Sequence, residues 1–187
     1  MKCTCPGHEK LRKSGKTFNF GIPFGMTYVG LAERLDKSRG EAKVILDFYY
    51  KTFPALEKFF KDSEKSSMDN NYMTGAAPTK RIRFFHPPIN EGERQVIGRE
   101  GKNFPIQECN ASMMKIAVIK LRKYILDNNF PAKLHLPVHD EILSSCHKDV
   151  AIKWKSIQIQ AMQEAADMFI EPGLLKTDTK MLEKWTK

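Results

Sequence analysis

Apolar positions recur at helical spacing over most of the chain. The clearest run lies in residues 40–66, where apolar side chains follow the i, i+3, i+4 pattern of one helical face. Those side chains are Val44, Ile45, Phe48, Tyr49, Phe53, Leu56 and Phe59. Pro54 lacks a backbone N–H and is expected to divide this run into two helices. The same spacing predicts helices over residues 8–22 and 27–36, and Pro23 ends or kinks the first of them.

Helical spacing also dominates the second half of the chain. Residues 106–127 predict a long helix with one buried face, and residues 149–170 predict the last long helix. The buried face comprises Met113, Met114, Ala117, Val118, Leu121 and Ile125. A shorter helix is expected over residues 90–103, with Pro105 breaking the chain's helical path before residue 106.

Two stretches depart from helical spacing. Between residues 66 and 88 the period fails around a basic Lys-Arg-Ile-Arg run, which predicts a loop or a short ribbon. The stretch LPVHDEIL, residues 136–143, ends an alternating pattern that predicts a strand, and its Ile-Leu pair predicts the return strand of a hairpin. A short strand is possible after residue 170. The chain is therefore expected to be α+β and predominantly helical, with a small antiparallel sheet.

Composition limits the class of protein. The 187 residues are 41% hydrophobic and 28% charged, as in an ordinary globular domain. No apolar run approaches the roughly 20 residues that span a bilayer, and the first ten residues, MKCTCPGHEK, lack the apolar core of a signal peptide. We therefore expect an intracellular protein that is neither secreted nor bound to a membrane. Cys3, Cys5 and His8 are either half of a zinc site or part of a loose N-terminus.

The positive charge is concentrated in the first half of the chain. Residues 1–87 hold 16 Lys and Arg against 9 Asp and Glu, whereas residues 88–187 hold 15 against 13. The net charge of +9 thus divides into +7 and +2. Such an excess favours contact with phosphates, although a merely solvated basic surface gives the same count.

The first constellation of candidate residues lies in RKSGKTFNFGIPFG. Arg12, Lys16, Phe20 and Phe24 stand at steps of four, which keeps side chains on one helical stripe. Two cations followed by two rings suit a ligand with a polyphosphate at one end and a planar base at the other. The alternative is an amphipathic helix whose cations are solvated and whose rings are core.

Two further constellations follow. Arg99, Asn103 and Gln107, again at steps of four, can donate to the minor-groove acceptors that base pairs share, or they are helix-end residues in solvent. The His-Asp-Glu run, residues 139–141, lies at the expected hairpin tip, where a carboxylate could bind a divalent cation. The alternative is a polar kink in a strand.

Taken in this order, these pieces resemble the C-terminal part of family A DNA polymerases, of the bacterial DNA polymerase I type. The stripe from Arg12 to Gly25 is similar to motif B, the fingers helix that clamps the incoming nucleotide. Residues 73–83 resemble the basic segment that follows the fingers in phage enzymes. Arg99-x3-Asn103-x-Pro105-x-Gln107 resembles the palm segment that faces the minor groove, and Val-His-Asp-Glu, residues 138–141, resembles motif C.

The resemblance implies a role for each candidate residue. Arg12 and Lys16 would bind the triphosphate of a dNTP, Phe20 would stack against its base and sugar, and Phe24 would lie beside the templating base. The residues implied in binding primer–template DNA are Arg99, Asn103, Gln107, His139, Lys80, Arg81 and Arg83. The implied metal ligands for a pair of Mg²⁺ ions are Asp140 and Glu141. The residues implied to serve catalysis are Asp140, Lys16 and His139.

The chain departs from the family pattern at several positions. Phe24 stands where Tyr is usual, and Gln107-Glu108-Cys109 replaces a usual Gln-Gly-Thr run. An Asp common a few residues later is matched by Ser112. We expect the acidic Glu108 to lie near a helix start that faces DNA, where it would favour the helix dipole.

The largest departure is the lack of motif A, which should precede motif B and supply the other metal-binding aspartate. We therefore expect residues 1–9 to be a tail, residues 10–87 a fingers subdomain and residues 88–187 the C-terminal part of a palm, in a partial right-hand polymerase fold. The expected function is that of one subunit of a split DNA-directed DNA polymerase, found in a bacterial cytoplasm or a phage-infected host. It would be inactive without an N-terminal chain that brings motif A and the thumb. The alternatives are a non-catalytic remnant that binds DNA or protein, and a truncated polymerase.

Overall fold

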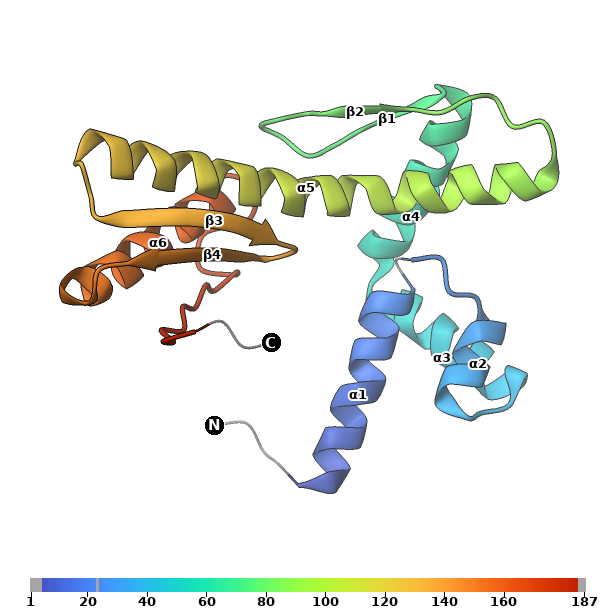
Figure 1. Ribbon diagram of the computed structural model, residues 1–187. Helices are drawn as coiled ribbons and strands as arrows, with labels where there is room; N and C mark the ends of the chain where they lie inside the picture. Colours follow the sequence, from blue (N-terminus) through green and yellow to red (C-terminus); the bar gives the residue numbers. More distant parts are fainter. Residues whose placement is uncertain (1–4, 23, 185–187) are drawn as a thin grey trace. The chain divides into compact units, whose positions relative to one another are not determined.

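The computed structural model describes residues 5–22 and 24–184, and these divide into two compact units. The first holds Met1–Thr74 and Ile82–Pro105, and the second holds Gly75–Arg81 and Ile106–Lys187. The helices α1 to α6 and the strands β1 to β4 are labelled in Figure 1. Among the described helices, none is both long and apolar enough to cross a membrane.

Four helices precede the first strand of unit one. They are α1 (Pro6–Gly21), α2 (Tyr28–Leu35), α3 (Arg39–Thr52) and α4 (Pro54–Asp69). Prolines open α1 and α4, where the missing N–H would have no helical partner in any case. The predicted division of the long apolar run at Pro54 is therefore confirmed. Helix α1 begins at Pro6, two residues before the start predicted from helical spacing.

The core of these helices lies where α2 meets α3. Leu31, Ala32 and Ala42 are buried there. Partly buried apolar side chains pack against them, namely Phe18, Met26, Leu35, Ile45 and Leu46. Phe18 comes from α1, so one face of α1 contributes to this core.

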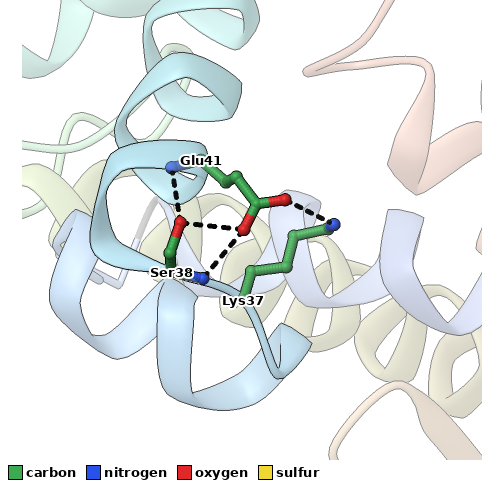
Figure 2. Close-up of polar contacts among 3 residues, drawn as sticks. All are labelled: Lys37, Ser38 and Glu41. Atoms are coloured by element: carbon green, nitrogen blue, oxygen red, sulfur yellow. Dashed lines mark hydrogen bonds and ion pairs between the residues drawn. The ribbon is translucent and has the colours of Figure 1, made fainter.

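A capping box fixes the turn between α2 and α3, as Figure 2 shows. The Ser38 hydroxyl accepts a hydrogen bond from the Glu41 N–H over 3.2 Å, and the Glu41 carboxylate accepts one from the Ser38 N–H over 3.0 Å. Lys37 adds an ion pair to the same carboxylate over 3.4 Å. The hydrogen bonds from Ser38, and then the charge of Lys37, lower the pKa of Glu41.

The aperiodic stretch after α4 forms a short ribbon. Strands β1 (Tyr72–Thr74) and β2 (Ile82–Phe84) pair antiparallel, with Met73 opposite Arg83. The prediction of a loop or short ribbon is thus confirmed as a ribbon, and the loop at its tip, Gly75–Arg81, belongs to unit two.

Helix α5 runs without interruption from Glu91 to Asp127 and contains Pro105. The prediction that Pro105 breaks the helix is wrong. Packing on both sides of the proline outweighs the lost hydrogen bond. Before it, Gly101 lies so close to α4 that a Cβ on it would come within 2.5 Å of the Ser67 Cβ. After it, the predicted buried face is present, with Met114, Ala117 and Leu121 buried.

Unit two is built around a hairpin and two helices. Strands β3 (Ala132–Val138) and β4 (Glu141–Cys146) pair antiparallel, which confirms the predicted hairpin. A short 3-10 turn, η1 (Lys148–Val150), leads into α6 (Ala151–Ala166). The core of the unit consists of Leu121, Phe130, Trp154 and Ala161. The indole N–H of Trp154 donates to the Ser144 hydroxyl over 2.8 Å, and this bond ties α6 to β4.

The end of the chain differs from the prediction. Helix α6 ends at Ala166 rather than residue 170, and no strand lies between there and residue 184. The tail is attached by polar contacts, since Gln163 donates to the Leu175 carbonyl over 2.9 Å and Thr177 to the Ile159 carbonyl over 3.3 Å. The architecture is α+β and predominantly helical, as predicted, and the strands of the described residues form two separate antiparallel ribbons instead of one small sheet.

Candidate nucleotide and DNA interface

The cation and ring positions of α1 are exposed. Arg12 and Lys16 lie on the solvent side of the helix, and Phe20 is 64% exposed. Phe24, just beyond the helix, is 52% exposed. The alternative in which these two rings are core is therefore wrong, because Phe18 takes that place. A stripe of two cations and two exposed rings is left available to a ligand.

The two cations of this stripe are not neutralised within the part of the chain that the structure describes. None of the ion pairs there includes Arg12 or Lys16. The neighbouring Lys13, by contrast, lies 3.5 Å from the Glu9 carboxylate. The positive charges of Arg12 and Lys16 are therefore not offset by any described carboxylate and are available to an anionic ligand.

The turn after α1 depends on a glycine. Gly25 has a φ of +78°, a left-handed conformation that glycine adopts without steric strain. A Cβ at this position would lie 2.7 Å from Cγ and 2.8 Å from Cδ of Arg99. The aliphatic stem of Arg99, from α5, therefore packs directly on the turn that presents Phe24. Within unit one, the structure thus brings Arg99 of the second constellation against the turn at the end of the first.

The second constellation lies within α5 rather than at a helix end. Arg99 and Gln107 are exposed and Asn103 is half-buried. Because α5 continues through Pro105, these residues do not end a helix, although Arg99 and Gln107 do face solvent as that alternative expected.

The cations of the basic segment, residues 73–83, differ in whether they pair with a carboxylate. Lys80 and Arg81 are exposed in the loop of unit two and take part in none of the ion pairs found among residues 5–22 and 24–184. Arg83, in β2, pairs with Glu100 over 2.7 Å and lies 5.5 Å from the centre of the Phe85 ring. Lys80 and Arg81 are therefore better suited to phosphates than Arg83.

The polar run in LPVHDEIL is a tight hairpin connection. Val138 pairs with Glu141, so only His139 and Asp140 connect the strands, and His139 has a φ of +52°. All three polar side chains, those of His139, Asp140 and Glu141, are exposed. This connection contains neither Gly nor Asn, the residues usual in such turns, and His139 takes the left-handed conformation instead.

Metal-binding clusters are absent from the described residues, where no three His, Cys, Asp or Glu side chains gather as a metal site requires. Asp140 and Glu141 offer the oxygen ligands that Mg²⁺ prefers, but they account for only part of a site. In the proposed zinc half-site, Cys5 Sγ lies 3.1 Å from His8 Nδ1. Cys3 lies outside the described residues.

Sequence reasoning misplaced Glu108. It lies in the middle of α5 and is only 4% exposed, so neither proximity to a helix start nor the helix dipole applies. Its carboxylate hydrogen-bonds to Ser112 one turn later and to Thr79 from the loop. Burial, and then the charge of Glu108, raise the pKa of the adjacent Cys109 thiol. Thr79 carries no sequence signal of this contact, since it is 29 residues from Glu108.

The chain is similar to known proteins in both sequence and fold. The model of DNA polymerase family A matches residues 6–187. The chain is 31% identical to DNA polymerase I of Streptococcus pneumoniae (strain TIGR4) over 85% of its own length and 18% of that protein. It is 28% identical to DNA polymerase I of Aquifex aeolicus over 94% of its length and 30% of the relative. The chain thus spans about a fifth to a third of these relatives.

A solved structure gives the same result for the fold. The polymerase domain of Pol1 from M. smegmatis, in complex with DNA primer-template and dNTP, matches with a TM-score of 0.78 and 26% identity. The match covers 86% of this chain and 28% of that one. The two ribbons and long helices described above are therefore part of a polymerase domain. Because the family model covers nearly all of its length, the chain belongs to DNA polymerase family A.

Proposed function

We propose that this chain provides the nucleotide-binding and DNA-binding surfaces of a DNA-directed DNA polymerase and acts with a separate chain that brings motif A and the thumb. The observation that carries the proposal is the exposed stripe of α1, where Arg12 and Lys16 have no carboxylate partner among the described residues and Phe20 is 64% exposed. A solvated basic helix would not need two exposed rings beside its free cations. A dNTP presents both a polyphosphate and a planar base, so it accounts for both features.

The roles of the stripe follow from its chemistry. Arg12 can hold phosphate oxygens with its planar fork of donors, and Lys16 can follow the charge on the leaving pyrophosphate as a mobile point charge. Phe20 and Phe24 provide ring faces for the incoming base and its template partner. Phosphoryl transfer is accelerated mainly by such positioning and charge stabilisation.

The remaining candidate residues are assigned to DNA and metal. Arg99, Asn103 and Gln107 would donate to minor-groove acceptors that are common to all base pairs, which tests duplex geometry without reading sequence. Lys80 and Arg81 would contact phosphates, with Arg83 and His139 near the duplex. In this proposal the fingers comprise residues 10–87 and the palm part residues 88–187.

Magnesium would be held jointly with the partner chain. Asp140, with Glu141 beside it, would supply carboxylate ligands, and an aspartate of motif A would supply the rest. Bound magnesium would lower the charge repulsion between primer 3′-oxygen and phosphate. We expect this chain to be inactive alone, because Asp140 and Glu141 account for only part of such a site.

The affinity for a nucleotide, measured in variants of Lys16 and of the nearby Lys13, tests the proposal. Lys16→Ala removes a charge-assisted contact worth about 1.5–3 kcal/mol, so the affinity for a fluorescent dNTP should fall about 10–150-fold in the presence of primer–template DNA. Lys13→Ala is the matched control, because Lys13 is paired with Glu9 and lies outside the stripe. Equal losses in the two variants, or no loss in either, would contradict the proposal.

The second candidate function is a non-catalytic remnant that binds DNA or protein. It is favoured by the departures from the family pattern at Glu108, Cys109 and Ser112, and by the Oε2 atom of Glu108, which is buried without a partner among the described residues. A remnant would bind DNA but would support no primer extension with any chain that carries motif A. Primer extension by this chain mixed with a chain that carries motif A therefore distinguishes the two functions.

A further inference from the structure

Glu108 joins helix α5 to the basic loop within unit two. Its Oε1 atom accepts a hydrogen bond from the Ser112 hydroxyl and another, over 3.0 Å, from the Thr79 hydroxyl. The Thr79 and Ser112 hydroxyl oxygens lie 3.3 Å apart. Glu108 and Ser112 are 4% and 2% exposed. One carboxylate oxygen thus receives a hydroxyl from the helix and a hydroxyl from the loop.

The other carboxylate oxygen faces the start of the same loop. A Cβ added to Gly75 would lie 2.6 Å from the Cδ atom of Glu108, so the loop backbone approaches the carboxylate closely and a side chain at this position would displace it. Oε2 itself has no hydrogen-bond partner among the described residues. A buried carboxylate oxygen without a partner destabilises a fold, so stability alone does not explain Glu108 at this position.

The loop held in this way carries two exposed cations. Its ends are closed by a hydrogen bond from the Gly75 N–H to the Arg81 carbonyl over 2.7 Å, and the Lys80 N–H donates to the Ala76 carbonyl over 2.9 Å. Lys80 has a φ of +45°, a strained conformation for a residue with a side chain. Such a conformation persists when surrounding contacts hold it. The hydrogen bonds from the loop to Glu108 and Ser112 come from Thr79, the residue before Lys80.

We infer that Glu108, Ser112 and Thr79 form a clasp that positions Lys80 and Arg81 for contact with DNA phosphates. The inference rests on the proposed function, because it assigns the two cations to DNA. The three clasp residues are positioning residues and do not touch the DNA themselves. Without the clasp the loop would have to be ordered on binding, and this cost exceeds what two solvent-exposed phosphate contacts contribute, so both contacts would be lost.

Limited trypsin digestion without DNA tests the clasp itself. Trypsin cleaves after Lys80 and Arg81, so the rate of cleavage there reports release of the loop. We expect Thr79→Val, which keeps the shape but removes the hydroxyl, to raise that rate at least fivefold. Gly75→Ala should also raise the cleavage rate, because its methyl group would displace the Glu108 carboxylate. Thr79→Ser keeps the hydroxyl and should be cleaved at the wild-type rate. Thr52→Val is the matched control, because the Thr52 hydroxyl bonds only to a carbonyl of its own helix. An unchanged cleavage rate in Thr79→Val would overturn the clasp.

The salt dependence of DNA binding tests whether the clasp brings Lys80 and Arg81 into contact with DNA phosphates. Each lost phosphate contact lowers the slope of log affinity against log salt by about 0.9. Fluorescence anisotropy with primer–template DNA should therefore show a slope lower by about 2 in Thr79→Val, equal to the change in the Lys80→Ala, Arg81→Ala double variant. Adding Thr79→Val to that double variant should change nothing further. Additive losses, or an unchanged slope in Thr79→Val, would overturn the inference. A wild-type chain without salt-dependent DNA binding would overturn the proposed function, whatever the trypsin rates.

Discussion

Replacing Gly25 by alanine tests the turn that presents Phe24 and supports Arg99. Gly25 has a φ of +78°, and forcing an alanine into that region costs about 1–2 kcal/mol. The new methyl group would lie 2.7 Å from Cγ of Arg99, so the arginine stem must also move. We expect Gly25→Ala to lower the free energy of unfolding by about 1–3 kcal/mol, since the flexible stem relieves part of the clash.

Urea denaturation followed by far-UV circular dichroism measures this change. Amide hydrogen exchange at Leu31 and Ala32, in the core of the first unit, locates it. Gly40→Ala is the matched control, because Gly40 has open space around its Cα and lies in helix α3. Alanine there should leave stability unchanged or raise it by up to about 1 kcal/mol. If Gly25→Ala were as stable as Gly40→Ala, the argument from backbone conformation and Arg99 packing would be refuted.

Two further changes test the elements around the site. Glu41 has a lowered pKa in the folded chain, so its capping box stabilises the fold above the unfolded value of 4.5 and this contribution is lost as pH falls through the lowered pKa. Unfolding midpoints between pH 7 and pH 3 should therefore decline less steeply in Glu41→Gln than in the wild type, and equal slopes would contradict the assignment. Leu121→Ala, at a site with 0% exposure, should cost about 2–5 kcal/mol of unfolding free energy and lower the Trp154 fluorescence midpoint in urea. A cost below about 1 kcal/mol would contradict the described core.

Much of the fold could be predicted from the local chemistry of the sequence. The hairpin of LPVHDEIL followed from alternation, and the division of the helical run at Pro54 followed from the missing N–H. Pro105 has the same chemistry, yet α5 passes through it. The difference is tertiary packing on both sides of Pro105, which no single-sequence pattern records.

The candidate site was predictable to a similar degree. Spacing placed Arg12, Lys16 and Phe20 on one stripe, but only the structure separates Phe18 in the core from Phe20 in solvent. The contact of Thr79 with Glu108 joins residues 29 positions apart and has no period to reveal it. Long-range polar contacts of this kind depend on the packed backbone rather than on local pattern.

Primer extension by the chain mixed with a chain that brings motif A and the thumb tests the central claim most directly. With a primer–template, the four dNTPs and magnesium, we expect extension by the mixture and none by either chain alone. Asp140→Ala should abolish extension while DNA binding by anisotropy changes less than about threefold, because Asp140 is an exposed residue at a hairpin tip. A stable but inactive complex of the wild-type chains, or full activity with Asp140→Ala, would contradict the account.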